Sequence, residues 1–421
     1  MIVNTRLVGL LFGGSLLLAA CGGSSQTAAP ASSAAAATSG AAAGSSGASG
    51  SSLAGQPQAS AGAALPPGAA NSDLVKSLIA RANQEGSLAV ETVDSSMPAA
   101  GTIKSGFIQA FQPLGLHIDV QVGAGQQPAV WANAQAAIST GVAPQYDAML
   151  GPISEVYPYF KENLLQPIDN WQELVTAVNP SAANGTVKID NYSPAPLAGK
   201  ALLFNELYKV MIYNSTVSQD KLPTSYADMT NPKFKGRFYV PPWSGAYDYG
   251  IFAYPKDKWL EMAKQIGQNA ADVQTYPAGI QKILAGNADF QQDNLDDYFT
   301  QKALSANSPV AYGWFNDITA IDLQFYVVPV KAKHSAAATL FAAWATTDAA
   351  RANWSPSYVA VNLRTGHLPQ DEAVRKSLDA AKPKIGGVLD SPDGLATLDW
   401  LSTPAGQAYE KALVQGLTKR G

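Results

Sequence analysis

Residues 87–122 read "SLAVETVDSSMPAAGTIKSGFIQAFQPLGLHIDVQV", and this stretch decides the fold because a strand, a helix and a second strand follow one another in it. It begins with a run of strand-forming side chains, and residues 116–122 alternate between apolar and polar ones. The helix between them has an apolar face at helical spacing: Ile103, Phe107, Ile108 and Phe111. The alternation of strands and helices predicts an α/β lobe with a mostly parallel sheet.

The same alternation continues outward. An amphipathic helix follows Ser72 and ends at Gly86. Further predicted elements are a helix at 128–142, a buried strand at 146–150, strands at 207–216 and 322–330, helices at 278–286 and 334–348, a loop at 291–299, and a last helix from Pro404, which Thr403 caps. About 350 residues from position 72 onward are more than one core usually holds, so we expect two lobes.

Two loops are candidate binding loops, because ligands of parallel sheets bind beyond the carboxyl ends of the strands. The first is Asp94-Ser95-Ser96 and the second is Gly123-Ala124-Gly125-Gln126, a predicted turn. Ser95 and Ser96 would bind an anion through their hydroxyls and the N-terminus of the following helix, or one of them would simply cap that helix. Ser95, Ser96 and Gly125 are the ligand contacts predicted here.

The N-terminus has the features of a secretory signal peptide. Arg6 precedes an apolar run at 7–20, which is too short and too rich in glycine for a permanent membrane span. The sequence Leu18-Ala19-Ala20-Cys21 resembles a bacterial lipobox, which predicts lipid attachment at Cys21 after removal of residues 1–20. We therefore expect a lipid-anchored, extracytoplasmic protein of the cell membrane, facing either a periplasm or an open cell surface. An ordinary signal peptide with an incidental cysteine is the alternative.

The composition limits both the architecture and the function. Residues 21–71 are almost all Ala, Ser, Gly and Pro, with no charged side chain before Asp73, and this predicts a disordered tether. The chain has 28 basic and 32 acidic residues and a net charge of −4, so a nucleic-acid partner is not expected. The lone cysteine excludes disulfides, Cys-zinc sites and iron–sulfur clusters from the folded part.

No enzyme motif is present in the sequence. The three histidines lack metal-site spacing, and neither G-x-S-x-G nor a phosphate-binding G-x-x-x-x-G-K-[ST] occurs. We expect neither catalysis nor a cofactor. A surface-anchored hydrolase using the carboxylates of Asp296 and Asp297, and a structural or adhesive surface protein, are the alternatives.

Three stretches carry a resemblance to a known family: "LIARANQEGSLAVETV" (78–93), "MIYNSTV" (211–217) with "KLPTSYADMTNPKFKGRF" (221–238), and "FYVVPVKAKHSAAATLFAAWAT" (325–346). They resemble the extracellular solute-binding proteins of ABC importers, family 1, in the ferric-iron-type cluster. The resemblance implies a type II periplasmic-binding-protein-like fold with two lobes, mostly parallel sheets and hinge strands between the lobes. It also implies a monomer that traps a small solute between the lobes and delivers it to an ABC permease.

The predicted domain boundaries follow from this resemblance. Lobe 1 is expected at 72–212, with 322–350 returning to it. Lobe 2 is expected at 213–321, with 351–421 completing it. The lobes would rotate about the strands near 207–216 and 318–330.

The solute is expected to be a small organic or oxyanionic molecule. Ferric-binding relatives use an adjacent tyrosine pair, but here Tyr298 is followed by Phe299, which cannot ligate a metal. A ferric-iron receptor using Tyr298 with Asp293, Asp296 or Asp297 is the alternative, and no resident metal is predicted. Tyr298 either contacts the solute or packs in the lobe.

Two further segments are predicted to line the ligand site. "PPWSGAYDYG" (241–250) offers Trp243, Ser244 and Tyr247, and "AYGWFND" (311–317) offers Trp314 and Asp317. Each would be a wall of the cleft or an ordinary aromatic-rich turn. The charge of the solute is not predicted.

Overall fold

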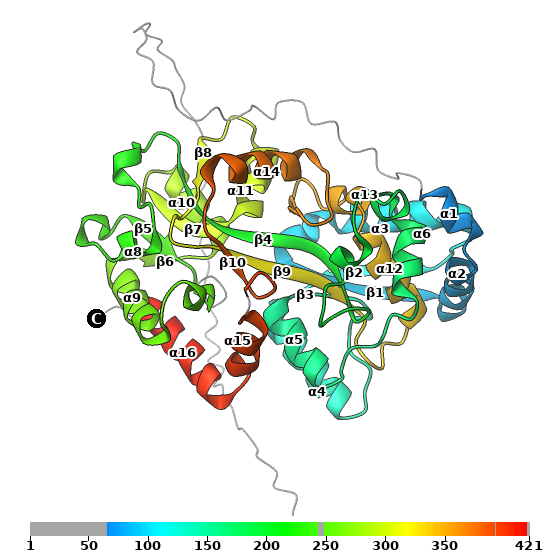
Figure 1. Cartoon of the computed structure of the whole chain (residues 1–421). Coiled ribbons are helices and arrows are strands. Elements are labelled where there is room, and N and C mark those ends of the chain that lie inside the picture. The colour runs from blue at the N-terminus through cyan, green and yellow to red at the C-terminus, as the bar shows by residue number, and fades with distance from the viewer. Residues whose placement is uncertain (1–64, 243–247, 392, 419–421) are drawn as a thin grey trace, which may run out of the picture. The chain divides into compact units, whose positions relative to one another are not determined.

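The computed structural model describes residues 65–242, 248–391 and 393–418, which belong to one compact unit (Figure 1). The predicted signal peptide, Cys21 and most of the predicted tether lie outside the described residues. The end of the tether is a correction, because helix α1 (Pro67–Asn71) belongs to the folded unit. Ala69 is buried, and α1 contacts helix α6 (Trp171–Val178), so this charge-free segment does bury apolar surface.

Ten strands are described: β1 (Ser87–Thr92), β2 (Asp119–Ala124), β3 (Met149–Pro152), β4 (Ala201–Asn214), β5 (Phe238–Val240), β6 (Asp272–Val273), β7 (Phe290–Asn294), β8 (Val310–Gly313), β9 (Thr319–Val327) and β10 (Ile385–Gly387). The predicted parallel pairing holds for β1 with β2, β5 with β6 and β7, and β9 with β10. Every antiparallel pair described includes β4 or β9.

These two strands connect the parts of the larger sheet. Figure 1 shows β4 and β9 as long neighbouring strands between β1–β3 on one side and β5–β8 on the other. Every residue of both strands is buried. Because two antiparallel segments cross the middle of the unit side by side, they have the arrangement expected of hinge strands.

The helices of more than one turn lie between and outside these strands: α2 (Asp73–Glu85), α3 (Ala100–Phe111), α4 (Gln127–Ser139), α5 (Ile153–Lys161), α6 (Trp171–Val178), α9 (Lys256–Asn269), α10 (Tyr276–Leu284), α11 (Leu295–Leu304), α12 (Ser335–Ala345), α13 (Asp348–Ala352), α14 (Pro369–Ala381), α15 (Gly394–Leu401) and α16 (Pro404–Thr418). Two short helices are α7 (Pro180–Ala183) and α8 (Tyr226–Met229). The 3₁₀ segments include η1 (Asp94–Ala99) and η7 (Asp248–Phe252).

Separate apolar cores fill the two ends of the unit. One is built by α2, α3, α6 and α12 around β1 and β2, and another by α8, α9 and α16 around β5. A third lies between them along β3, β4 and β9. Trp354 and Tyr358 belong to the first core, although the predicted boundary at residue 350 assigns them to lobe 2.

Several predicted ends are confirmed by hydrogen bonds. Ser72 accepts from the Val75 N–H at 3.2 Å and so caps α2, and Gly86 ends it with φ 77°. Thr403 accepts from the Gly406 N–H at 3.2 Å where α16 begins.

Two predicted loops are wrong. Residues 291–299 form the end of β7 and the start of α11, because Gln291 and Gln292 are buried and pair with β4 despite their polarity. The predicted turn after β2 starts later, since Ala124 still pairs with Thr92.

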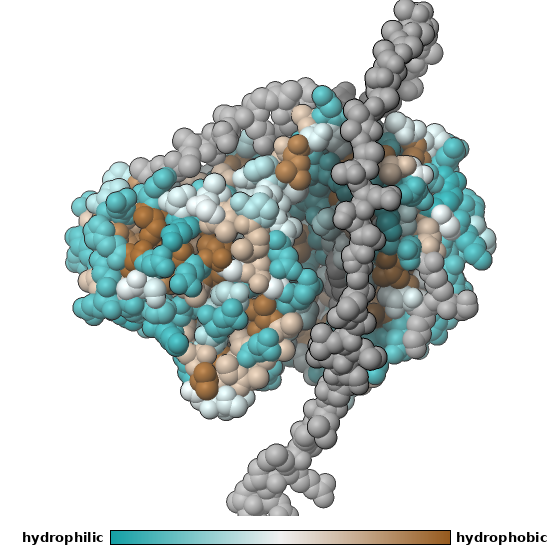
Figure 2. Space-filling model, turned by 180° about the vertical axis from the view of Figure 1, so that it is seen from behind, coloured by the Kyte–Doolittle hydropathy of each residue, from teal (hydrophilic) through white to brown (hydrophobic). Residues whose placement is uncertain are grey.

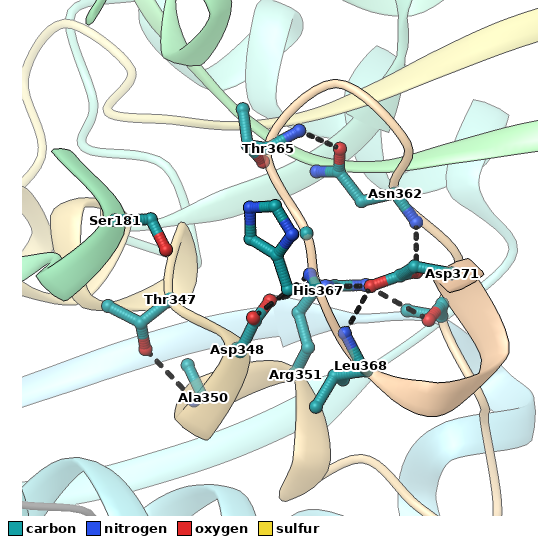
Figure 3. A network of polar contacts seen from close by, with 12 residues as sticks. Ser181, Thr347, Asp348, Ala350, Arg351, Asn362, Thr365, His367, Leu368 and Asp371 are labelled. Atoms are coloured by element: carbon teal, nitrogen blue, oxygen red, sulfur yellow. Dashed lines mark hydrogen bonds and ion pairs between the residues drawn. The ribbon is translucent and has the colours of Figure 1, made fainter. Parts of the chain in front are cut away.

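A buried ion pair fixes the segment that returns to the first core. The Arg351 guanidinium donates to Asp371 Oδ2 at 2.6 Å and to Asp348 Oδ1 at 2.5 Å (Figure 3). Asp371 also accepts from the Asn362 and Leu368 N–H groups, both at 2.8 Å. These bonds attach the loop before α14 to α13.

No helix among the described residues is long and apolar enough to cross a membrane. The face in Figure 2 is mostly polar, with apolar residues in small groups.

Candidate functional site

The carboxyl ends of strands from both parts of the sheet meet beside the middle of β4 and β9. β3 runs parallel to β1, and its last residue, Pro152, lies opposite Gln324 of β9. From the other side, β7 ends at Asn294, opposite Lys209 of β4. Ligands bind beyond such strand ends, so the surroundings of Gln324 and Lys209 are the candidate site.

The two predicted binding loops lie together at one end of this region. Gln126 Nε2 donates to Asp94 Oδ2 at 2.7 Å, which joins the loop after β2 to the loop after β1. Ser95 is exposed and Gly125 is half-buried. Ser96 is fully buried, and its hydroxyl donates to the backbone of its own loop at 2.7 Å. The Ser96 hydroxyl is thus already used within the loop.

Five side chains on one face of β4 and β9 form what we call the polar belt: Asn205, Lys209, Asp322, Gln324 and Tyr326. Asn205 lies opposite Gln324, and alternate residues of a strand share a face. Each of the five is at most 5% exposed. The belt is therefore a line of polar groups in the interior, where the strand ends meet.

Hydrogen bonds connect the middle of the belt to α11 and to the segment after α13. Asn205 Nδ2 donates to Asp296 Oδ2 at 2.9 Å and to the Tyr358 hydroxyl at 2.7 Å. The Tyr358 hydroxyl donates in turn to Gln324 Oε1 at 3.2 Å. Three segments far apart in the sequence thus converge on Asn205.

Lys209 is the only basic side chain of the belt. Its Nζ donates to Asn294 Oδ1 at 2.7 Å. Burial lowers its pKa, and four surrounding carboxyl groups act in the opposite direction: Asp322, Asp293, Asp297 and Asp296. Burial raises the pKa of both Asp293 and Asp297, which also share a hydrogen bond. Carboxyl groups still outnumber the single ammonium.

Burial makes two carboxyl groups costly to ionise: Asp322 in the belt, and Asp296, which is hydrogen-bonded to the belt through Asn205. Burial raises the pKa of Asp322, partly offset by the Lys209 charge, the Tyr249 hydroxyl and the Ile153 N–H. Burial also raises the pKa of Asp296 well above its usual range, although Tyr358 and Asn205 counteract it. Desolvation is the dominant cause in both groups.

Several buried oxygens at the belt have no hydrogen-bond partner among the described residues. They are Asn205 Oδ1, Asp296 Oδ1, Asp322 Oδ1, Gln292 Oε1 on the same face of β7, and Glu91 Oε1 at the end of β1. Leaving a buried acceptor unpaired costs about 1–3 kcal/mol. All five accept hydrogen bonds, and the Tyr326 hydroxyl of the belt is also without a partner, so acceptors outnumber donors among the unpartnered atoms of the region.

The predicted aromatic contacts lie in a different place. The rings of Tyr298 and Tyr312 are 4.7 Å apart, and those of Tyr312 and Trp314 are 5.6 Å apart. Trp314 Nε1 donates to Ser377 Oγ at 2.9 Å. The register of β8 on β4 places Tyr312 on the face opposite to Lys209. Trp314 thus packs between elements, away from the belt, whereas Tyr298 directly follows Asp296 and Asp297 at the first turn of α11.

Asp317 is held within its own part of the fold. Its Oδ2 accepts from the Tyr254 hydroxyl at 2.6 Å and from the Ala227 N–H at 3.2 Å. Trp243, Ser244 and Tyr247 lie outside the described residues and remain predictions.

The geometry at Phe299 does not favour iron. Phe299 is 3% exposed, and its ring packs against Tyr298 at a centroid distance of 5.1 Å. Among the described residues, no group of three or more His, Cys, Asp or Glu side chains is arranged to hold a metal ion.

A serine, a histidine and an aspartate form a hydrogen-bonded chain elsewhere in the fold. Ser87 Oγ lies 2.9 Å from His334 Nε2, and His334 Nδ1 lies 2.7 Å from Asp147 Oδ2. The neighbouring N–H groups at the start of α12 would be the natural oxyanion donors. They donate instead to the Glu85 carboxylate, at 3.0 Å each. These Ser87–His334–Asp147 hydrogen bonds join α12 to β1, and the arrangement does not form a hydrolase site.

A surface hollow of about 630 Å³ lies near α14 and is lined by Lys188, Arg364, His367 and Arg375 among others. Arg364 is paired with Glu206 at 2.8 Å and Asp390 at 2.6 Å, and Arg375 with Glu372 at 2.6 Å. Its charges are thus largely compensated within the protein.

Sequence reasoning missed most of the belt. The available signal was a charged or amide residue inside an apolar strand, as in "ALLFNELYKVMIYN" (201–214) and "TAIDLQFYV" (319–327). Such residues are almost never buried without a partner or a function. The prediction used only the apolar character of these strands.

Comparison with known proteins identifies the family and the fold. The family model for bacterial extracellular solute-binding proteins matches residues 106–374, more than half of the chain. No curated protein matches the sequence.

Several solved structures are similar. Iron-bound HitA from Pseudomonas aeruginosa has a TM-score of 0.58 at 15% identity, over 75% of this chain and 99% of that chain. AgtB from A. tumefacien R10, in complex with agropinic acid, has a TM-score of 0.55 at 16% identity, over 79% and 98%. AfuA from Actinobacillus pleuropneumoniae, with fructose-6-phosphate bound, has a TM-score of 0.54 at 14% identity, over 70% and 99%.

The latter two are periplasmic binding proteins, so the predicted type II fold is confirmed. The family consists of binding proteins and not of enzymes. The chain belongs to the bacterial extracellular solute-binding protein family.

Proposed function

We propose that the chain captures one small solute at the polar belt, between two lobes that meet along β4 and β9, and delivers it to an ABC permease. The observation that carries the proposal is the set of buried oxygens without partners where the strand ends of both parts meet. A protein has little reason to bury such groups unless something else binds them. The solute is an organic or oxyanionic molecule in preference to ferric iron.

Access to the belt requires a conformational change, because its side chains are buried. The long strands β4 and β9 are the connections about which the lobes would rotate. The solute stabilises the closed form only to the extent that it binds this form more tightly than the open one. The permease would then recognise the closed form.

The proposed solute site combines the belt with some of the predicted contacts. Ser95, Ser96 and Gly125 lie at its first end, Tyr298 lies beside Asp297 at the other, and Trp243, Ser244 and Tyr247 are proposed to complete the wall. Trp314 and Asp317 are proposed as supporting residues only, since their polar atoms are bonded within the fold.

The proposed cellular location rests on the N-terminal sequence. Lipid attachment at Cys21 would hold a monomer on the outer side of the cell membrane, with the segment after it as a tether. Metabolic labelling of the chain with a radioactive fatty acid, with Cys21→Ser as the control, tests the anchor. Label on the Cys21→Ser variant would contradict it.

A thermal-shift panel tests the binding function. The full chain is melted with amino acids, amines, sugars, phosphonates and ferric citrate. A solute at a hundred times its Kd stabilises the folded chain by about 2.7 kcal/mol, which raises the melting temperature visibly. Absence of any shift across all these classes would contradict the proposed function.

A further inference from the structure

The unpartnered atoms of the belt indicate what the solute must contribute. Asn205 Oδ1, Asp296 Oδ1 and Asp322 Oδ1 all belong to side chains that are at most 5% exposed, and all accept hydrogen bonds. Gln292 Oε1 and Glu91 Oε1 add two more acceptors. A solute that fills this region therefore has to donate hydrogen bonds.

The charges around these acceptors favour a cation. Lys209 is the sole basic group among four aspartates, and its ammonium is bonded to Asn294 at 2.7 Å. Burial, and after it the charge of Asp322, raises the pKa of Glu155 on α5; burial and the charge of Glu155 likewise raise the pKa of Glu410 on α16. Acidic groups thus extend from the belt toward α5 and α16.

An anionic solute finds few donors here. The Ser96 hydroxyl donates to its own loop, and Thr92 Oγ1 already contacts both Ser96 and Trp354 Nε1. The Asn205 amide donates to Asp296 and Tyr358. The Asn205 donors are therefore used within the protein, and of the unpartnered atoms in this region only the Tyr326 hydroxyl can donate, whereas the five other oxygens accept.

We propose that the solute carries a protonated amine or a guanidinium group, which binds to the carboxylates of Asp296 and Asp322. This inference rests on the proposed function and narrows its solute class from organic or oxyanionic to organic and cationic. A cationic group compensates the excess of negative charge and also donates hydrogen bonds to the unpaired oxygens. A neutral hydroxyl would only donate the hydrogen bonds.

A four-carbon series with matched length tests the proposal by calorimetric titration of the full chain. The probes are 1,4-diaminobutane, 4-aminobutyrate, butane-1,4-diol and succinate, with agmatine as the guanidinium probe and Ca²⁺ as an inorganic cation. We expect binding of at least one amine or guanidinium probe, and at least tenfold weaker binding of the diol and of succinate.

Three variants locate the cationic group. Asp322→Asn and Asp296→Asn keep the shape of the side chain, and each should weaken binding of the cationic probe at least tenfold. Lys209→Met removes the competing ammonium and should raise that affinity. Asp119→Asn is the matched control, since Asp119 is an exposed carboxylate at the far end of β2 and should leave affinity within twofold.

The outcomes separate this inference from the proposed function. Binding of succinate, phosphonates or sugars alone, or loss of binding in Lys209→Met, would overturn the cationic solute and leave the chain a solute receptor. Binding of Ca²⁺ alone would also overturn it. Failure of every probe in this series and in the thermal-shift panel would overturn both.

Discussion

Two buried polar networks in this fold differ in how many of their carboxylate and amide oxygens have hydrogen-bond partners within the protein. Around Arg351, all four carboxylate oxygens of Asp348 and Asp371 accept hydrogen bonds from the guanidinium or from backbone N–H groups. The polar belt of Asn205, Lys209, Asp322, Gln324 and Tyr326 is equally buried but leaves carboxylate and amide oxygens without partners. Arg351 Nε has no partner in the first network, but the carboxylate oxygens of that network are all paired, whereas Asp296 and Asp322 each keep one unpaired oxygen.

The charges show the same contrast. Burial lowers the pKa of Arg351, but the carboxylates of Asp371 and Asp348 outweigh this effect and raise it. At the belt, by contrast, burial raises the pKa of Asp322 and lowers that of Lys209, and neither group fully compensates the other. The charges around Arg351 compensate one another within the protein, whereas we propose that the charges at the belt are compensated only when a cationic solute binds.

The largest expected effect is on the complete network. Asp371→Ala should lower the free energy of unfolding by about 3–5 kcal/mol, because it leaves the buried Arg351 guanidinium without its main partner. Urea denaturation followed by circular dichroism measures this loss, and solute affinity of the folded fraction should not change.

A double variant keeps this prediction testable if the single variant does not fold. Arg351→Met with Asp371→Leu removes both charges, and it should be more stable than Asp371→Ala alone. Equal loss in both variants would show that the charges of the network are not what stabilises the fold.

The belt should behave in the opposite way. Asp322→Asn should leave the free energy of unfolding of the solute-free chain equal or higher at pH 8, because it removes a poorly compensated buried carboxylate. The same variant should lose at least tenfold in solute affinity. A large loss of stability with normal affinity would contradict the distinction between the two networks.

The pH dependence sharpens the comparison. The raised pKa values mean that the folded chain holds protons that the unfolded chain has lost above about pH 4, so the contribution of these groups to stability falls as the pH rises. The ionisable groups that face Asp322 and Asp296 are Lys209, Asp293, Asp297, Glu155, Asp371, Tyr249 and Tyr358. A cationic solute compensates the ionised carboxylates, so it should raise the melting temperature more at pH 8 than at pH 5. An equal shift at both values would count against ionised belt carboxylates in binding.

Smaller effects are expected at the predicted aromatic contacts. Tyr298→Ala and Trp243→Ala should each weaken solute binding a few-fold without unfolding the chain, and Trp314→Ala should act on stability alone. Calorimetric titration and thermal melts of the three variants measure both quantities. Unchanged affinity in both Tyr298→Ala and Trp243→Ala would contradict the proposed wall of the site.

Much of the fold was predictable because local patterns agree with it. The helix after Ser72 and the last helix from Pro404 have the N-caps that the sequence predicts, and the strand–helix–strand unit at 87–122 forms with the predicted apolar face on its helix. β7 was not predictable in this way. Its sequence, "FQQDN", is polar, and it pairs with β4 because of its place in the sheet and not because of its composition.

The site was less predictable than the fold. The loops after β1 and β2 were predicted from strand order, and the structure brings them together through Asp94 and Gln126. The belt was missed because it depends on the register of β4 with β9, which aligns Asn205 with Gln324 across more than a hundred residues of sequence. No local pattern contains this pairing.

The measurement that tests the account most directly is the distance between the two lobes with and without solute. Val142, after α4, and Leu304, at the end of α11, are 60% and 61% exposed, so cysteines at these positions can carry spin labels in a Cys21→Ser chain. The account predicts a shorter distance when a cationic solute is added, and no shortening in Asp322→Asn. An unchanged distance in the chain with Asp322 intact, at a solute concentration that calorimetry shows to be saturating, would contradict capture between lobes that close on β4 and β9.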